Sequence, residues 1–234
     1  MSNPTDPTNP GHPACSSNPA NPTSAASLVQ KAKALGATLA VERAEKLLHY
    51  LDAMLALNEQ INLTAVRDRE AAVVLHALDG LAFAQSGLHP RHVLDLGSGN
   101  GFPGVCIAAM HPGASVVLMD KTGKKVRAIG TCLMTAKFDA VETVHMDAAQ
   151  APALRVDLRH AFDVVAARAV AKPEVLAELA DPLVRPGGHL VLWLEDNANA
   201  PERLGSFRRE NLISYDLPEP AARRRALGCW KKRQ

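Results

Sequence analysis

Residues 93–103 constrain the fold of this chain more than any other segment. A short apolar run with one acidic residue, Val93-Leu94-Asp95-Leu96, comes first, and glycines then occupy alternate positions. Glycine adopts positive φ and lets the backbone approach a ligand closely. Pro103 then stands where prolines open helices. The segment therefore predicts a buried strand that turns sharply into a helix, with a ligand-binding loop between the two.

The position of the glycines distinguishes two nucleoside-bearing cofactors. Residues 99–104 satisfy the dinucleotide fingerprint G-x-G-x-x-G, in which the first glycine directly follows the strand. Here Asp95 and Gly97 come first, and the order Asp-x-Gly-x-Gly-x-Gly is typical of methyltransferases that use S-adenosylmethionine. That cofactor has no pyrophosphate, and it needs glycines for close approach of its methionine and ribose parts. We therefore expect a methyl donor, bound by Asp95, Gly97, Gly99 and Gly101.

Strands and helices alternate after residue 90, which predicts an α/β fold with a mainly parallel sheet. The expected strands are 93–96, 115–120, 140–145, 162–167 and 190–194, and the expected helices between them are 103–110, 123–136 and 173–179. A tight turn is expected at 185–188, a further helix at 201–209, and strands at 212–217 and 226–230. Ligands of such sheets bind at the carboxyl ends of the strands, where Asp120, Ala148 and Arg168 are expected to lie with the glycine loop.

The chain divides into four parts. A Pro/Asn/Ser-rich tail at residues 1–27 is expected to be disordered, and residues 28–88 form a helical region with helices at 28–57 and from 68 to 85. A core at 89–222 is followed by a basic segment, residues 223–234, which holds six Lys or Arg and no acid. This segment can contact phosphates, or it can be a solvated terminus. No apolar run is long enough for a membrane span, and the four cysteines lack metal-ligand spacing.

Residues at the expected strand ends indicate the chemistry. Asp120 can accept the two ribose hydroxyls of the cofactor, or it can cap the next helix. Ala148 and Ala149 leave room for an adenine. Residues 162–169 contain neither the Asp/Asn-Pro-Pro-aromatic motif of amine methylases nor a Pro-Cys nucleophile. A target with a free lone pair, such as guanine N7, needs positioning rather than a base. Arg168 would orient the cofactor carboxylate or the target, with a surface salt bridge as the alternative.

The chain resembles the bacterial ribosomal RNA small subunit methyltransferase G family, also called GidB. Four motifs carry the resemblance: Asn58-x3-Asn62-Leu63-Thr64-x2-Arg67, His76-x2-Asp79, the segment from Asp95 to Gly104, and Ala167-Arg168-Ala169. The resemblance implies a class I, Rossmann-like S-adenosylmethionine-dependent methyltransferase with helices on both sheet faces and an N-terminal helical extension. It implies methylation of guanine N7 in 16S ribosomal RNA. Carried over by position, the family's cofactor contacts fall on Gly97, Phe102, Ala148, Ala149 and Arg168.

The RNA-facing side departs from the family pattern. Leu75 and Gly80 replace a usual arginine and serine, and Leu194-Glu195-Asp196 stands where a lysine commonly ends the fifth strand. The candidate substrate contacts are Asn62, Arg67, His76, Asp79, Arg223, Arg224 and Arg225. For His76 and Asp79 the alternative is a structural link to the Asn62 turn.

The expected partner is 16S ribosomal RNA or the small ribosomal subunit. The protein is expected to be a cytoplasmic monomer that uses neither a metal nor a membrane. Two other functions stay open at this stage, namely a small-molecule methyltransferase on the same fold and a non-catalytic RNA-binding module with a vestigial cofactor loop.

Overall fold

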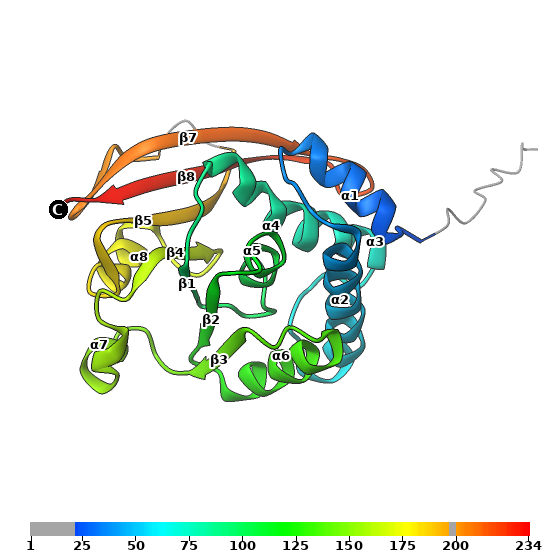
Figure 1. The fold of residues 1–234 in the computed structure, drawn as a ribbon, viewed down its shortest axis with the longest axis horizontal. Coiled ribbons are helices and arrows are strands. Elements are labelled where there is room, and N and C mark those ends of the chain that lie inside the picture. The colour runs from blue at the N-terminus through cyan, green and yellow to red at the C-terminus, as the bar shows by residue number, and fades with distance from the viewer. Residues whose placement is uncertain (1–21, 197–199) are drawn as a thin grey trace, which may run out of the picture.

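The fold comes from a computed structural model that describes residues 22–196 and 200–234 (Figure 1). Most of the predicted tail, residues 1–27, lies outside the described residues, as does Cys15. The predicted end of the tail is wrong by three residues, because helix α1 (Ala25–Ala34) already includes Ser27. The Ser24 side chain accepts a hydrogen bond from the backbone N–H of Ser27 and so caps the first turn of this helix.

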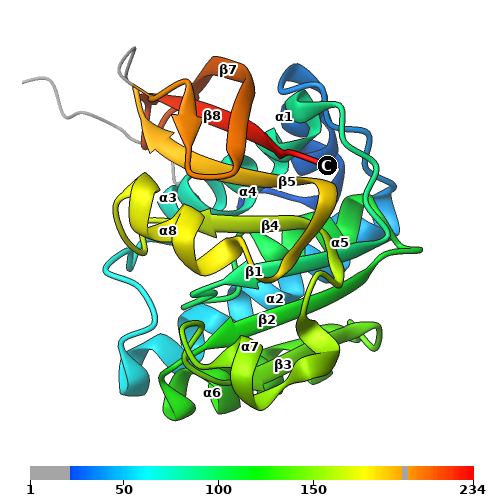
Figure 2. The same cartoon turned by 90° about the vertical axis from the view of Figure 1, so that its left-hand side faces the viewer.

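An eight-stranded sheet organises the molecule, with the order β3-β2-β1-β4-β5-β8-β7-β6. Figure 2 shows most of these strands side by side. Strands β1 to β5 pair in parallel, whereas β6, β7 and β8 pair in antiparallel fashion at one side. The strands are β1 (His92–Leu96), β2 (Ser115–Asp120), β3 (Val141–His145), β4 (Phe162–Arg168), β5 (Val184–Glu195), β6 (Arg203–Leu204), β7 (Phe207–Leu217) and β8 (Arg223–Lys232). The predicted mainly parallel sheet is confirmed.

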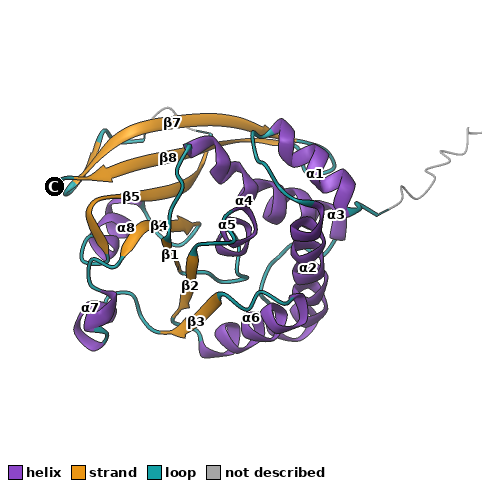
Figure 3. Cartoon of the chain, viewed as in Figure 1, coloured by secondary structure: helices purple, strands orange, loops and turns teal. Residues whose placement is uncertain are grey.

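Helices cover both faces of the sheet, as Figure 3 shows. The N-terminal helical region comprises α1, α2 (Val41–Ile61), α3 (Arg69–Ala72), the π-helix η1 (Val73–Leu78), α4 (Asp79–Leu81) and the 3-10 helix η2 (Ala82–Ser86). The later helices are α5 (Gly104–Met110), α6 (Gly123–Ala136), α7 (Ala151–Leu154), η3 (Val156–Leu158) and α8 (Pro173–Ala180). None of the described helices combines the length and the apolar character of a membrane span.

Alternation along the strands separates two hydrophobic cores. Val93 of β1 faces a core that includes α1, α2, α5 and α6, whereas its neighbour Leu94 faces a core with α7 and α8. Successive strand side chains point to opposite faces, so a parallel strand covered on both sides is apolar throughout. The N-terminal helices are therefore part of the main core and cover one face of the sheet.

Three predicted elements differ from the structure. The predicted helix 201–209 is wrong, because Leu204 and Phe207 pair across a hairpin between β6 and β7 that turns at Gly205, with φ of 57°. The expected turn at 185–188 lies within β5 and shifts its pairing with β4. The basic segment 223–234 is not an appendage, because its residues up to Lys232 form β8 between β5 and β7.

Candidate active site

The predicted glycine loop joins β1 to α5 as a tight turn. The backbone N–H groups of Gly97 and Ser98 both donate to the carbonyl of Met119 in β2, at 2.8 and 2.9 Å. Gly97, Gly99 and Gly101 have φ of 73°, 56° and 89°, a region that L-residues with side chains rarely adopt. The loop is therefore bent back over the ends of β1 and β2, as the spacing of the glycines predicts.

A cavity of about 610 Å³ opens beside this loop, within the usual size of small-molecule sites. It lies where β1, β2 and β4 end, the position expected for a ligand of a doubly wound sheet. Seven predicted site residues line it: Gly97, Gly99, Phe102, Asp120, Ala148, Arg168 and His76. The other predicted site residues are absent from the lining, namely Asp95, Gly101, Ala149, Asn62, Arg67, Asp79, Arg223, Arg224 and Arg225.

Asp120 presents a carboxylate to the cavity from the end of β2. Its Oδ2 accepts the N–H of Gly99 at 2.9 Å and its Oδ1 accepts that of Thr122 at 2.7 Å. Each oxygen has a further lone pair, so two hydroxyl donors can still bind. The N-cap position of α6 is held by Thr122, so the capping alternative for Asp120 is wrong.

Asp95 and Gly101 contact protein atoms that support the glycine loop, on the side away from the cavity lining. Asp95 is buried, and its Oδ2 accepts the N–H of Gly104 at 2.8 Å, which fixes the start of α5. A Cβ on Gly101 would lie 2.0 Å from the Tyr50 hydroxyl, so this glycine makes room for α2. Both residues were predicted to contact the cofactor, and the structure places them against protein atoms instead.

The exposed residues of the turn after α2 do not contribute to the cavity lining. Arg67 donates to the Asn62 side chain at 3.3 Å, and both residues are exposed. Asn62 itself has a positive φ of 55° at the C-cap of α2. The pair closes a turn, and neither residue lines the cavity.

We expect Asp95→Asn to change how stability depends on pH. Burial raises the pKa of Asp95 to about 7, while its Oδ1 has no partner among the described residues. Between the ordinary pKa of an unfolded aspartate and about 7, the folded state therefore binds more protons than the unfolded state. The unfolding free energy of the wild type should fall with rising pH through that window, by roughly 1.4 kcal/mol per unit relative to Asp95→Asn, and level off above it.

Urea denaturation from about pH 4.5 to 8.5 measures this difference, a window set by the usual aspartate pKa and the raised one. Asp139 is exposed, so Asp139→Asn is the matched control and should keep the wild-type slope. Parallel curves for wild type and Asp95→Asn would show that the buried carboxyl is not protonated in this range.

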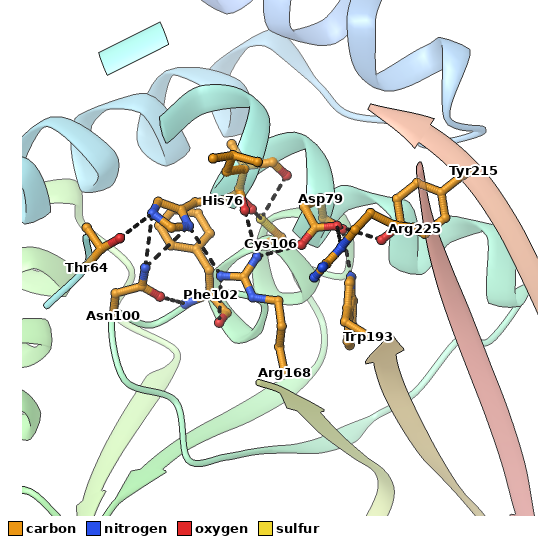
Figure 4. Close-up of polar contacts among 12 residues, drawn as sticks. Thr64, His76, Asp79, Asn100, Phe102, Cys106, Arg168, Trp193, Tyr215 and Arg225 are labelled. Atoms are coloured by element: carbon orange, nitrogen blue, oxygen red, sulfur yellow. Dashed lines mark hydrogen bonds and ion pairs between the residues drawn. The ribbon is translucent and has the colours of Figure 1, made fainter. Parts of the chain in front are cut away.

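Arg168 joins the sheet to the N-terminal helices (Figure 4). Its Nη1 donates to the carbonyl of Leu75 and to Asp79 Oδ2, each at 2.9 Å, and its Nη2 lies 3.3 Å from the carbonyl of Phe102. The Arg168 and Asp79 side chains are only 10% and 2% exposed. A surface salt bridge is therefore excluded, because this ion pair is buried at the cavity wall.

His76 occupies the cavity wall in a neutral form. Burial, with the neighbouring Arg168 guanidinium, lowers the pKa of His76 to about 3. Arg168 Nη2, which can only donate, lies 3.4 Å from Nδ1, so Nδ1 accepts and Nε2–H donates to the Thr64 hydroxyl at 3.0 Å. The ring stacks on Phe102 with centroids 5.6 Å apart. His76 is therefore linked to the turn after α2 through Thr64. His76 belongs to the π-helix η1, which places its ring in the cavity wall.

Asp79 belongs to a buried network and does not face the cavity. Its Oδ1 accepts the Tyr215 hydroxyl at 2.6 Å and lies 3.6 Å from Arg225 Nε, and its carbonyl accepts Trp193 Nε1 at 2.8 Å. With Arg168 Nη1 on Oδ2, both carboxylate oxygens contact protein donors, and the ion pair holds the Arg168 guanidinium in place.

The arginines at the start of β8 are balanced by acids. Arg225 Nη1 donates to Glu195 at 2.9 Å, and Arg224 Nε lies 3.6 Å from Asp196. The Arg225 side chain is only 10% exposed. The last cations of the chain, from Lys231 on, lie at the other end of β8, where Lys231 is opposite His189 in the middle of β5. The single basic cluster that the sequence indicates is thus divided and largely neutralised by the fold.

Several cavity residues were not predicted from the sequence. Asn100 lies 3.4 Å from the His76 ring, while its side-chain oxygen accepts the N–H of Phe102. Val170 of the loop after β4, Lys121 before α6 and Lys125 in its first turn also line the cavity. The two lysines had a visible signal, because four cations and no acid occur from Lys121 to Arg127.

Comparison with known proteins gives the family of this chain. The family model described as "GidB: rRNA small subunit methyltransferase G" matches residues 43–210. A protein named "Ribosomal RNA small subunit methyltransferase G" from Caldanaerobacter subterraneus is 34% identical, covering 70% of this chain and 69% of its own. Its namesake from Lachnoclostridium phytofermentans is 31% identical, covering 88% of each chain.

Solved structures resemble the fold at low identity. A structure concerned with the conversion of a disulfide bond into a thioacetal group during echinomycin biosynthesis aligns with a TM-score of 0.52 and 14% identity, covering 66% of this chain and 80% of that one. Such a likeness concerns the fold alone. The extent of the family match shows that this chain belongs to the rRNA small subunit methyltransferase G family, with the class I methyltransferase fold.

Proposed function

We propose that this protein transfers the methyl group of S-adenosylmethionine to N7 of one guanine in 16S ribosomal RNA. The observation that carries the proposal is the cavity at the strand ends, walled by the glycine loop, Asp120, the neutral His76 and Arg168, in a chain of this family. The proposed substrate is a component of the small ribosomal subunit, which implies action in the cytoplasm.

The cavity residues fit the parts of S-adenosylmethionine. Asp120 has lone pairs free for two ribose hydroxyls, and Ala148 beside Met146 offers a small, apolar surface for a base. Arg168 has one donor, Nε–H, without an acceptor among the described residues, and it would serve a carboxylate. When bound, the cofactor supplies an electrophilic methyl group on its sulfonium.

Two residues of the cavity wall, His76 and Arg168, are unsuited to act as a general base, which supports a reaction without one. The ring of His76 stays neutral far below physiological pH, and both of its nitrogens already have partners. Arg168 remains charged and cannot take a proton. Guanine N7 has a free lone pair, so the chain's residues need only hold the base in line with the methyl group and exclude water.

Methylation of RNA from a strain that lacks the gene tests the proposal. The protein, with labelled S-adenosylmethionine, should modify one guanine in small subunits or in free 16S RNA, at a site cleavable by the chemistry of N7-methylguanine. Single-turnover rates should be nearly flat from about pH 6.5 to 8.5. A rate that rises tenfold per pH unit, or label on an exocyclic or hydroxyl group, would contradict it. Transfer only to small molecules, or no cofactor binding, would favour the alternative functions.

A further inference from the structure

A cluster of unbalanced positive charge lies beside the cavity. Lys121, Lys124, Lys125 and Arg127, here called the α6 cations, surround the first turn of α6. Lys121 and Lys125 line the cavity, whereas Lys124 and Arg127 are exposed. The cluster therefore extends from the cavity wall to the outer surface of the molecule.

These charges are not neutralised by neighbouring acids. Among the ion pairs of residues 22–196 and 200–234, none includes an α6 cation. Two acids, Asp120 and Asp147, line the same cavity, but their carboxylates accept backbone N–H groups, of Gly99 and Thr122 for Asp120 and of Ala149 for Asp147. The contrast with β8 is plain, because Arg224 and Arg225 there pair with Asp196 and Glu195.

The location of the cluster opposes helix stability. The N-terminal end of a helix carries partial positive charge, so acids are favourable there and cations are unfavourable. The first turn of α6 has no acid, and it holds two lysines instead. These cations therefore do not stabilise the helix, but they would stabilise an anion bound nearby.

The α6 cations are arranged to meet a polyanion. Lys124 and Arg127 are three residues apart on α6 and so lie on the same, outer side of the helix, whereas Lys125 faces the cavity. A nucleotide held with its base in the cavity has phosphates on both sides along its chain. We propose that the α6 cations bind the RNA phosphates that flank the target guanine. This inference rests on the proposed function.

Paired neutral substitutions test the proposal. Lys124→Gln with Arg127→Gln removes two exposed cations that do not line the cavity. The matched control, Arg208→Gln with Arg233→Gln, removes two exposed cations at the opposite side of the sheet. Arg208 of β7 is the strand neighbour of Lys231 in β8, and β8 in turn lies beside β5. Affinity for unmethylated 16S RNA is measured by filter binding over a range of salt, with cofactor affinity by calorimetry and Tm by circular dichroism.

The α6 variant should reduce the slope of log affinity against log salt by about 1.4–1.8, because two phosphate contacts are lost. Between about 50 and 200 mM salt, the wild type should then lose roughly tenfold more affinity than the variant. The control should keep the wild-type slope. Cofactor affinity should not change in either variant, and Tm of the α6 variant should stay the same or rise.

Three results would overturn the inference: an unchanged slope in the α6 variant, an equal loss in the control, or weakened cofactor binding in the α6 variant. A failure of the proposed function is distinguished by the methylation assay. In that case the wild type modifies no guanine N7 in 16S RNA, whatever the slopes of the variants.

Discussion

Replacing Asp79 with alanine is expected to lower the free energy of unfolding by about 3–5 kcal/mol, the usual cost of leaving a buried charge without its partner. Asp79 is 2% exposed and is the only acid that contacts the Arg168 guanidinium among the described ion pairs. Alanine leaves Nη1 of Arg168 with the Leu75 carbonyl alone, and it also frees the Tyr215 hydroxyl. Urea denaturation followed by circular dichroism measures the loss.

Tyr215→Phe is the matched comparison, because it removes one hydrogen bond to the same carboxylate and leaves the ion pair in place. Its expected loss is about 1.5–3 kcal/mol, the range for a hydrogen bond to a charged group. Asp79→Ala should also weaken cofactor binding, since Arg168 loses its fixed position at the cavity. Equal losses for the two variants would mean that the buried ion pair adds nothing beyond the tyrosine contact.

Elements with a strong local pattern could be predicted from the sequence. The bounds of β2 (Ser115–Asp120) and α6 (Gly123–Ala136) agree with the prediction to the residue. Both elements carry an apolar pattern suited to their type, with a short apolar run typical of a buried strand in one and a buried helical face in the other. The segment 201–209 lacked such a pattern, and its structure depends on pairing with the distant strand β8.

The cavity was predictable to the extent that its residues follow strands. The glycine loop, Asp120 and Arg168 stand at strand ends, and parallel strands bring their carboxyl ends to one edge. The partners of Asp79 were not predictable, because Tyr215 is 136 residues away in sequence. Spacing along one helix indicates which side chains share a face, but not what that face contacts.

The distribution of charged residues along the sequence was the least reliable basis for predicting the charged surface of the protein. The run from Arg223 to Arg233 is conspicuous in the sequence, yet Arg225 and Lys232 are buried and paired with Glu195 and Asp181. A count along the chain does not include acids contributed by neighbouring strands. Only the fold shows which cations keep their charge unbalanced.

A side chain at Gly97 is expected to remove cofactor binding. A Cβ at this position would lie 2.6 Å from Cγ2 and 2.9 Å from Cγ1 of Val170, which lines the cavity. The φ of 73° adds strain of about 1–2 kcal/mol for any L-residue with a side chain. Gly97→Ala should therefore push Val170 toward the ligand and weaken S-adenosylmethionine binding at least about tenfold, equivalent to 1.4 kcal/mol. Gly97→Val should abolish it.

Two comparisons separate the collision from the backbone strain. Gly205 also has positive φ, at 57°, but a Cβ there meets no atom within 4 Å. Gly205→Ala should therefore cost similar stability and leave calorimetric cofactor affinity unchanged. Val170→Ala removes both Cγ atoms and leaves Cβ at an ordinary 3.4 Å, so the double variant Gly97→Ala with Val170→Ala should regain affinity toward that of Val170→Ala alone. If the double variant binds as weakly as Gly97→Ala, the loss comes from the loop backbone, and the contact between Gly97 and Val170 does not shape the cofactor site.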